Sequence, residues 1–426
     1  IDYIFYWKDP FPTIDHTQIF YSPHLPSSDD TAIFNYQDDI INSYVDKITD
    51  DEPFYVVDLN KIKEKYIDWK KLLPNVIPYY AVKCNPDAKI VKLLASLGSN
   101  FDCASIAEFD IVRSSGVSSD RIIYANPCKN KLHIECAKEY NIDHLVIDSV
   151  SELIKIYETY PNAKLVIRMK VDDSASECKF STKFGSDQRT INNILKMANR
   201  LNINIIGISF HIGSNCKGNG FYMKAIKNAR YVFDKAIEDY GMEMSFLDIG
   251  GGFPGINEGN ISMDFFANEI NFAINTYFGD LKNINIIAEP GRYFVTSSHT
   301  LAVNIINVKE TNTGNSYTVN DGIYGSFNCV IFDHNDPIFI PLKRKNDRHK
   351  LKENLYLTTI FGPTCDSVDK ITTTAMLPKL NIGDWCYIEN FGAYTRASSS
   401  NFNGFGPIRV FYTGTDIVTT CHSNVA

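Results

Sequence analysis

The sequence lacks several features that mark specialised classes of protein. None of its ten cysteines forms a Cys-x-x-Cys pair, and its nine histidines form no cluster at metal-ligand spacing. These absences predict that the protein has no metal site and no disulfide framework, and that its thiols stay reduced, as in a cytoplasmic protein. No apolar run approaches the roughly 20 residues of a membrane span. The first residues also lack a basic segment followed by a long apolar one, so we expect neither a membrane segment nor a signal peptide.

The chain also has no excess of positive charge. It carries 42 Lys and Arg against 50 Asp and Glu, a formal net charge of −8. General nucleic-acid binding needs basic patches, so we do not expect nucleic acid as a partner. The hydrophobic fraction of 44% and the charged fraction of 22% are ordinary for globular proteins. A length of 426 residues predicts two domains.

The middle of the chain alternates between β-rich runs and segments with helical periodicity. Eight strand-like runs, rich in Val, Ile and Phe as buried parallel strands require, are Ile77–Lys83, Asn100–Cys103, Arg121–Ala125, His144–Asp148, Lys164–Val171, Ile203–His211, Met244–Ile249 and Ile284–Glu289. Eight such units predict a (β/α)8 TIM barrel. A doubly wound parallel sheet is the alternative.

After Gly291 the pattern changes to short β-rich runs separated by Gly, Pro, Asn and Asp. These runs are Leu301–Lys309, Ser316–Val319, Asn328–Phe332, Asn354–Ile360, Asp384–Asn390 and Ile408–Thr413. They predict an antiparallel β-sheet or β-barrel domain. Residues 1–58 also look β-like. The predicted organisation is therefore a barrel over residues 59–298 and a β domain formed by residues 1–58 and 299–426.

Reactive side chains stand at the ends of the predicted barrel strands, where barrel enzymes place their chemistry. Lys83 ends an apolar run, and desolvation there would lower its pKa and make the amine nucleophilic. Glycines 250–252 follow the seventh run, where exposed backbone N–H groups together with Arg292 could hold a phosphate. Glu289 could pair with a ring nitrogen and His211 could stack on the ring.

Each of these features alone has an ordinary structural explanation. Lys83 could be a lysine whose charged end reaches solvent at a strand end, and the glycines could form a tight turn. His211 could be a satisfied core histidine, and Glu289 could belong to a salt bridge. Taken together, an amine, a phosphate loop and a carboxylate for a ring nitrogen fit one cofactor, pyridoxal 5'-phosphate.

Longer motifs connect this interpretation to a family. They are Tyr-Ala-Val-Lys-Cys-Asn (80–85), Ser-Phe-His-Ile-Gly-Ser (209–214), Gly-Gly-Gly-Phe-Pro-Gly (250–255), Glu-Pro-Gly-Arg (289–292), Gly-Pro-Thr-Cys-Asp (362–366) and Gly-Ala-Tyr (392–394). From about Phe54 to Pro407 the chain resembles the ornithine decarboxylase branch of the pyridoxal-phosphate barrel decarboxylases. These are the group IV decarboxylases, which have the alanine racemase-like fold type III.

The resemblance implies a role for each matching residue. The implied catalytic residues are Lys83, His211, Glu289 and Cys365, of which Lys83 binds the cofactor covalently and Cys365 returns a proton to the substrate. The implied cofactor-binding residues are Lys83, Asp102, Glu108, Arg168, His211, Ser214, Gly250, Gly251, Gly252, Glu289, Gly291, Arg292 and Tyr394. The implied substrate-binding residues are Asp333, Asp366, Tyr324 and Phe402.

The implied reaction is the decarboxylation of L-ornithine to putrescine and CO2, the first step of polyamine biosynthesis. The implied assembly is a homodimer in which the partner completes each site with Cys365 and Asp366. The alternatives are a decarboxylase of lysine, arginine or diaminopimelate, and a catalytically inactive regulator like the antizyme inhibitors. Diaminopimelate decarboxylases typically carry Cys-Glu-Ser where this chain has Cys365-Asp366-Ser367, which favours ornithine.

Three departures from the family pattern stand out. Phe332 replaces a frequent tyrosine, and Arg396 follows Gly-Ala-Tyr-Thr where a small or apolar residue is usual. Residues 131–154 correspond to the antizyme-binding element of animal members, which is basic. Here that segment holds two lysines and five acidic residues, so we do not expect antizyme binding.

Overall fold

The computed structural model describes residues 31–258, 261–311, 314–344 and 354–414. The chain divides into two compact units, residues 1–47 and 48–426. In the first unit the described element is the helix α1 (Thr31–Val45). The prediction that residues 1–58 are β-like was therefore wrong for this segment. Its apolar residues Ile33, Ile40, Ile41 and Tyr44 recur at helical spacing, a period that the prediction overlooked.

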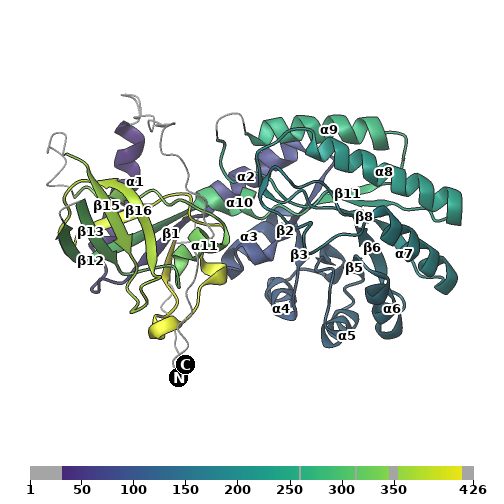
Figure 1. Ribbon diagram of the computed structural model, residues 1–426, viewed down its shortest axis with the longest axis horizontal. Helices are drawn as coiled ribbons and strands as arrows, with labels where there is room; N and C mark the ends of the chain where they lie inside the picture. The colour runs from purple at the N-terminus through teal and green to yellow at the C-terminus, as the bar shows by residue number, and fades with distance from the viewer. Residues whose placement is uncertain (1–30, 259–260, 312–313, 345–353, 415–426) are drawn as a thin grey trace, which may run out of the picture. The chain divides into compact units, whose positions relative to one another are not determined.

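Eight parallel strands close into a barrel in the second unit (Figure 1). In spatial order they are β2 (Ile77–Ala81), β3 (Asn100–Cys103), β4 (Ile122–Tyr124), β5 (His144–Ile147), β6 (Lys164–Arg168), β8 (Ile205–Ser209), β10 (Phe246–Asp248) and β11 (Asn285–Ala288). Each predicted run contains one of these strands. The barrel is confirmed over the doubly wound alternative because β11 pairs with β2 and closes the sheet.

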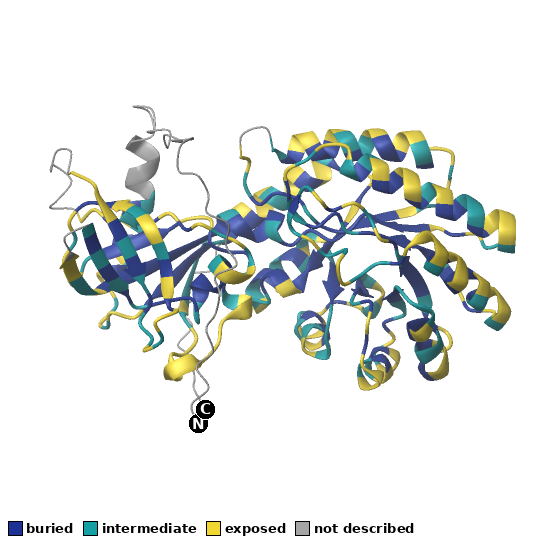
Figure 2. Ribbon diagram, viewed as in Figure 1, coloured by how far each residue is buried: buried dark blue, intermediate teal, exposed yellow. Residues whose placement is uncertain are grey.

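Helices follow the strands and cover the outside of the barrel (Figure 1). They are α2 (Leu59–Leu72), α3 (Ala88–Leu97), α4 (Ile106–Ser114), α5 (Lys131–Glu139), α6 (Val150–Thr159), α7 (Gln188–Leu201), α8 (Phe221–Tyr240) and α9 (Met263–Phe278). Several begin with an Asp or Ser whose side chain accepts a backbone N–H of the first turn, as at Asp87 and Ser105. Figure 2 shows buried residues on the strands and on the helix faces turned toward them. The barrel lumen is filled by a cluster of apolar residues, Tyr79, Ile123, Ala125, Val146, Val166, Phe246 and Ile287.

Short elements at the strand ends complete the barrel. They are η1 (Val82–Cys84), η2 (Ser119–Arg121), β7 (Ser176–Cys178), β9 (Ser214–Cys216), α10 (Arg292–Val295) and η3 (Thr296–Ser298). Strands β7 and β9 pair as an antiparallel two-stranded sheet. They extend the loops after β6 and β8, so that β9 brings Ser214 close to α10.

An eight-stranded sheet forms the β domain of the second unit. Its strands are β1 (Phe54–Asp58), β12 (His299–Thr311), β13 (Gly314–Val319), β14 (Ile340–Pro341), β15 (Tyr356–Phe361), β16 (Lys370–Leu377), β17 (Trp385–Ile388) and β18 (Arg409–Thr413). The predicted antiparallel sheet is confirmed, with two parallel pairs, β1–β18 and β13–β15, inside it. The short helices are η4 (Ser326–Asn328), α11 (Cys329–Phe332), η5 (Arg396–Ser398) and η6 (Phe402–Gly404).

The predicted strand Asn328–Phe332 is helical instead. Periodicity cannot distinguish a strand from a helix in an apolar run this short. A local network of hydrogen bonds holds this segment in a helical conformation. The Asp321 carboxylate accepts the Ser326 N–H at 3.2 Å, and the Asn328 amide donates to the carbonyls of Gly325 and Thr395 at 2.6 and 2.5 Å. These bonds close a turn that an extended strand could not make.

Two expected absences concern only the described part of the chain. No helix there combines the length and the hydrophobicity that a bilayer span requires. Within the same residues, no group of three or more His, Cys, Asp or Glu side chains is placed to hold a metal ion.

Candidate active site

Lys83 lies just beyond β2, in the turn η1, beside the end of β3. The prediction ran this strand to Lys83, but the strand ends at Ala81 because residues 82–84 turn as a 3-10 helix. The Lys83 Nζ donates to Asp102 Oδ2 at 2.5 Å. The lysine side chain is 44% exposed whereas its carboxylate partner is 1% exposed. The amine can therefore be reached from outside, while its counterion is fixed inside the protein.

The pKa of Lys83 is shifted in the direction opposite to the prediction. Burial alone would lower the pKa of Lys83, but the carboxylates of Asp102 and Glu289 raise it by more, so the net pKa lies above that of an ordinary lysine. The prediction that desolvation lowers the pKa was wrong because it counted no facing carboxylates. Lys83 is thus protonated at neutral pH, and this proton must leave before the amine can act as a nucleophile.

A second pair of acidic side chains lies at the ends of β10 and β11, and β11 is the neighbour of β2. Glu289 directly follows β11 and Asp248 ends β10, and both are buried. Burial raises the pKa of Asp248 to about 7. Burial, with repulsion from Asp248 and Asp102, raises the pKa of Glu289 well above its usual value. Burial and mutual repulsion thus favour a proton on this pair of carboxyls, whereas the positive charges of Arg168 and Lys83 oppose it.

Sequence reasoning missed Asp248. A signal was present, because this acidic residue occupies the last position of a buried strand, two residues before the first of the three glycines. Its Oδ1 accepts the Gly250 N–H at 2.8 Å, which fixes the start of the glycine turn. A small cavity in the barrel is lined by Arg168, Ser209, Asp248 and Glu289, among other residues.

The imidazole of His211 is neutral. Burial, reinforced by the positive charges of Arg168 and Lys83, lowers the pKa of His211 well below its usual value. Its Nδ1 accepts the Gly213 N–H at 3.0 Å, which leaves the proton on Nε2. The edge of Phe180, another residue that the sequence did not indicate, packs against the imidazole with the ring centroids 4.9 Å apart.

Arg292 is the first residue of α10 and the centre of a cluster of donors. It donates to both oxygens of Asp333, at 2.8 and 2.7 Å, and to Ser214 Oγ at 3.0 Å. Its Nε is buried without a partner. The Tyr394 ring lies 5.0 Å from the guanidinium carbon. The unpartnered donor beside a serine hydroxyl suits a further anion.

The glycine run borders the same region. Gly250 has a φ of +64°, which favours glycine. A Cβ on Gly251 would lie 2.8 Å from His211 Nε2 and 2.9 Å from the Glu289 carbonyl oxygen, so only glycine fits between them. Bare backbone at this point and the free Nε of Arg292 together fit a phosphate group.

Two predicted cofactor residues have additional structural partners. Glu108 Oε2 accepts the Ala104 N–H at 2.6 Å, while Ser105 Oγ accepts the Glu108 N–H at 3.3 Å. This reciprocal arrangement caps α4, and burial raises the pKa of Glu108. Arg168 ends β6, with its guanidinium carbon 5.2 Å from the centre of the Phe184 ring.

The remaining predicted residues form a separate cluster in the β domain. The Tyr324 hydroxyl donates to Asp366 Oδ2 at 2.5 Å, and its ring stacks on Phe402 with the centroids 4.3 Å apart. Cys365 is exposed, and its Sγ lies 3.3 Å from Asn403 Oδ1. Among the residues that the structure describes, no hydrogen bond or ion pair joins this cluster to Lys83 or Arg292. One subunit therefore does not bring Cys365 and Asp366 to the barrel site through direct polar contacts.

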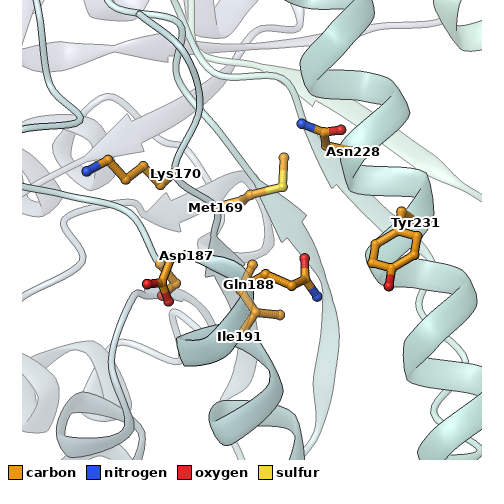
Figure 3. A pocket seen from close by; sticks show the side chains of 8 residues that line it. Met169, Lys170, Asp187, Gln188, Ile191, Asn228 and Tyr231 are labelled. Carbon is orange, nitrogen blue, oxygen red and sulfur yellow. The ribbon is translucent and has the colours of Figure 1, made fainter.

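A larger cavity of about 370 Å³ lies elsewhere, between the start of α7 and the outer face of α8 (Figure 3). Lys170, Asp187, Gln188 and Tyr231 are among its lining residues. None of the predicted site residues lines it, so it is not part of the site built around Lys83.

Comparison with known proteins agrees with this geometry. Residues 59–296 match the family described as pyridoxal-dependent decarboxylase, pyridoxal binding domain. Ornithine decarboxylase of Mus musculus is 43% identical over 391 residues, which cover 88% of this chain and 84% of that protein. Antizyme inhibitor 2 of Xenopus laevis is 44% identical over 387 residues, with the same coverage of 88% and 84%.

Solved structures give the same fold. The arginine decarboxylase of Paramecium bursaria Chlorella virus superimposes with a TM-score of 0.84 and 36% identity, over 88% of this chain and all of that one. The lysine/ornithine decarboxylase of Vibrio vulnificus, solved with putrescine, gives 0.79 and 31% over 89% and 98% of the two chains. The chain belongs to the pyridoxal-dependent decarboxylase family, in its ornithine decarboxylase branch.

Proposed function

We propose that this protein catalyses the decarboxylation of L-ornithine to putrescine and CO2, the first step of polyamine biosynthesis. The observation that carries the proposal is the Lys83–Asp102 pair at the barrel mouth, close to Glu289 and beside the donors around Arg292. The 43% identity to the mouse ornithine decarboxylase supports ornithine as the substrate.

The site fits pyridoxal 5'-phosphate, the cofactor of the family. When bound, this cofactor supplies an aldehyde for covalent attachment and a ring that accepts the electrons left by CO2. Lys83 would hold the aldehyde end, and Glu289 the ring nitrogen. Arg292 Nε, Ser214 and the glycine backbone would hold the phosphate.

The arrangement of the protein's own groups supports this chemistry. Asp102 Oδ2, 2.5 Å from Lys83 Nζ, accepts a hydrogen bond from the ammonium and holds it in place at the barrel mouth. Neutral His211 can pack against a flat ring without adding positive charge. The Glu289–Asp248 pair can release its proton and leave a carboxylate for a cationic ring nitrogen. Each group thus has a defined protonation state before substrate arrives.

Substrate selection would depend on carboxylates for the far amine of ornithine. Asp333 lies beside the phosphate region, where it forms an ion pair with Arg292. Asp366 lies in the separate cluster and would come from the second subunit. Burying an ammonium without a counterion is costly, so a substrate without a far amine should bind poorly.

We also propose a homodimer with shared active sites. In one subunit Cys365 and Asp366 have no polar contact with the described groups around Lys83, so a second copy would supply them. The partner subunit's Cys365 would then return a proton to the substrate Cα. Apolar side chains beside Asp333 are exposed, with Phe332 at 68% and Ile338 at 76%. Such side chains suit burial against another subunit.

Two further assignments belong to this proposal. For the division into a barrel over residues 59–298 and a β domain of residues 1–58 with 299–426, the pairing of β1 with β12 and β18 supports placing residues 54–58 in the β domain, whereas residues 1–47 form a unit of their own. A cytoplasmic location is supported by the nine described cysteines, all of which are free.

A second candidate function is that of a catalytically inactive regulator. The 44% identity to antizyme inhibitor 2 favours it. The intact Lys83–Asp102 pair and the Arg292 cluster weigh against it, because a regulator has no need of a charged amine held at a barrel mouth. The acidic balance of residues 131–154 also weighs against antizyme as a partner.

The test is product formation by the purified protein. Incubation with pyridoxal 5'-phosphate and L-ornithine should release equal amounts of CO2 and putrescine, and the Lys83→Ala variant should release neither. Cofactor uptake without any product, at protein concentrations high enough for a dimer, would favour the inactive regulator.

A further inference from the structure

Arg396 departs from the family pattern and has no part in the chemistry above. It begins η5, two residues after Tyr394, and its Nη1 lies 3.2 Å from Asp87 Oδ2. Asp87 is 7% exposed and Arg396 is 27% exposed, so the pair is shielded from solvent more than a surface ion pair is. The carboxylate also accepts the Tyr412 hydroxyl and the Lys89 N–H, the latter as the N-cap of α3.

The ion pair is one of three contacts between two segments of the site. One segment follows β2 and carries Lys83. The other follows β17 and carries Tyr394. The Tyr394 N–H donates to the Cys84 carbonyl at 3.0 Å, and the Asn85 amide donates to the Gly392 carbonyl at 2.9 Å. The ion pair continues this series at the far end of both segments.

The conformation of Tyr394 needs such restraint. Its φ is +54°, in the left-handed region that a non-glycine residue adopts only when its surroundings hold it there. The bond to Cys84 fixes the residue itself. The ion pair of Arg396, two residues later, also restrains the chain that follows Tyr394. The Thr395 carbonyl accepts the Asn328 amide at 2.5 Å, so the chain beyond Tyr394 is also held there, and the ion pair of Arg396 adds the anchor that ties it to the segment carrying Lys83.

We propose that Arg396 is a positioning residue that sets the distance between Lys83 and the Tyr394–Arg292 phosphate region. The inference rests on the proposed cofactor site, because those two places hold opposite ends of one molecule, its aldehyde and its phosphate. A ligand that spans both ends gains from a fixed separation, whereas a ligand that touches one end does not.

Removal of Arg396 should leave the fold intact. Asp87 keeps two other donors, Tyr412 and the Lys89 backbone, so the cap of α3 survives. The effect should fall on the segment that carries Tyr394. A change in cofactor affinity can therefore be distinguished from a loss of folding stability.

The experiment compares two probes, pyridoxal 5'-phosphate and pyridoxal, which lacks the phosphate. Their dissociation constants are measured by absorbance titration of the purified apoprotein, for wild type, Arg396→Ala, Arg396→Lys and Arg409→Ala. Arg409 is the matched control because it also pairs with an aspartate, Asp50 at 2.8 Å, away from the site.

Arg396→Ala should bind pyridoxal 5'-phosphate about tenfold more weakly, the scale of one lost bond to a charged group. Its affinity for pyridoxal should be unchanged. Arg396→Lys, which keeps the charge, should recover most of the loss, and Arg409→Ala should bind both probes as wild type does. Equal weakening for both probes, or unchanged affinity for pyridoxal 5'-phosphate, would overturn the inference.

The same titration separates this inference from the proposed function. A wild-type protein that binds pyridoxal 5'-phosphate but leaves ornithine intact contradicts the activity and not the role of Arg396. A wild-type protein that does not bind pyridoxal 5'-phosphate overturns both.

Discussion

At the scale of single residues, the site is organised by two ion pairs and one pair of neighbouring acidic groups. Lys83 faces Asp102, Arg292 faces Asp333, and Glu289 shares its surroundings with Asp248. The sequence identified most of these residues by type and motif. It could not show the pairs, because charge pairing depends on which strand ends meet in space. The direction of the Lys83 pKa was wrong for this reason.

The first prediction concerns the Arg292 cluster. Replacing Arg292 by alanine removes several donors from the phosphate region and leaves the Asp333 carboxylate without its counterion. We expect affinity for pyridoxal 5'-phosphate to fall about 100-fold, the scale of a lost bidentate ionic contact. Absorbance titration measures it, and Ser214→Ala, which removes one hydroxyl, should have a smaller effect. Unchanged affinity in Arg292→Ala would refute the assignment of the phosphate site.

The second prediction concerns Asp333 as the residue that determines which substrate length the site prefers. Asp333→Glu adds one methylene and moves the carboxylate into the pocket. We expect the ratio of kcat/KM for ornithine to that for L-2,4-diaminobutyrate, which is one methylene shorter, to fall about tenfold. Competition between the two substrates measures this ratio directly. An unchanged ratio would remove Asp333 from substrate selection.

At the scale of elements, the barrel strands were predictable and the β domain was less so. Eight apolar runs alternating with helical segments admit few arrangements, so the eight barrel strands could be read from the sequence, whereas the short strands β7 and β9 were not predicted. The short run Asn328–Phe332 could not, because hydrogen bonds from Asp321 and Asn328 decide its conformation. The strand β16 was missed because exposed residues, Thr373 and Thr374 among them, interrupt its apolar pattern.

The third prediction belongs to the junction between the barrel and β12. His299, the first residue of β12, is fully buried and lies 3.1 Å from the Asn85 amide. Burial lowers its pKa to about 4, while Asp87 opposes and Arg396 reinforces this shift. The unfolded chain binds a proton near pH 6.5 and the folded chain does not. The stabilisation is therefore complete above that pH and is lost as pH falls toward 4.

His299→Gln removes this titration and keeps an amide for hydrogen bonding. Between pH 7 and pH 4, wild type should lose about 3 kcal/mol more free energy of unfolding than the variant does. Urea denaturation of the apoprotein at several pH values measures the difference. Between pH 7 and 8 the two curves should run parallel, and parallel curves down to pH 4 would show that His299 is not buried as a neutral group.

At the scale of the whole molecule, the candidate site is divided between two clusters that one subunit does not join by polar contacts. The motifs around Cys365 and Asp366 indicated their importance. In the structure Asp366 pairs with Tyr324, which stacks on Phe402, and Cys365 lies beside Asn403, with no hydrogen bond or ion pair to Lys83 among the described residues. The family resemblance implied that a partner supplies Cys365 and Asp366, whereas spacing along the chain by itself does not reveal which subunit supplies a group.

The fourth prediction tests this division by complementation. Lys83→Ala and Cys365→Ala should each be nearly inactive alone. A mixture allowed to exchange subunits should recover about one quarter of wild-type activity, because half of the dimers are mixed and each has one intact site. Lys83→Ala mixed with Arg292→Ala should recover nothing, since both changes lie in the barrel. Activity lost in every mixture would show that each subunit uses its own Cys365.

The most direct test of the central claim is a competition between substrates. Wild-type protein with pyridoxal 5'-phosphate would receive equal concentrations of L-ornithine, L-lysine, L-arginine and meso-diaminopimelate in one tube, and the products would be quantified at low conversion. The account predicts that putrescine forms in large excess over cadaverine, agmatine and lysine. If another product dominated, the barrel and the cofactor site would remain, but the assignment of ornithine would be contradicted. If no product formed, the chain would not be a decarboxylase.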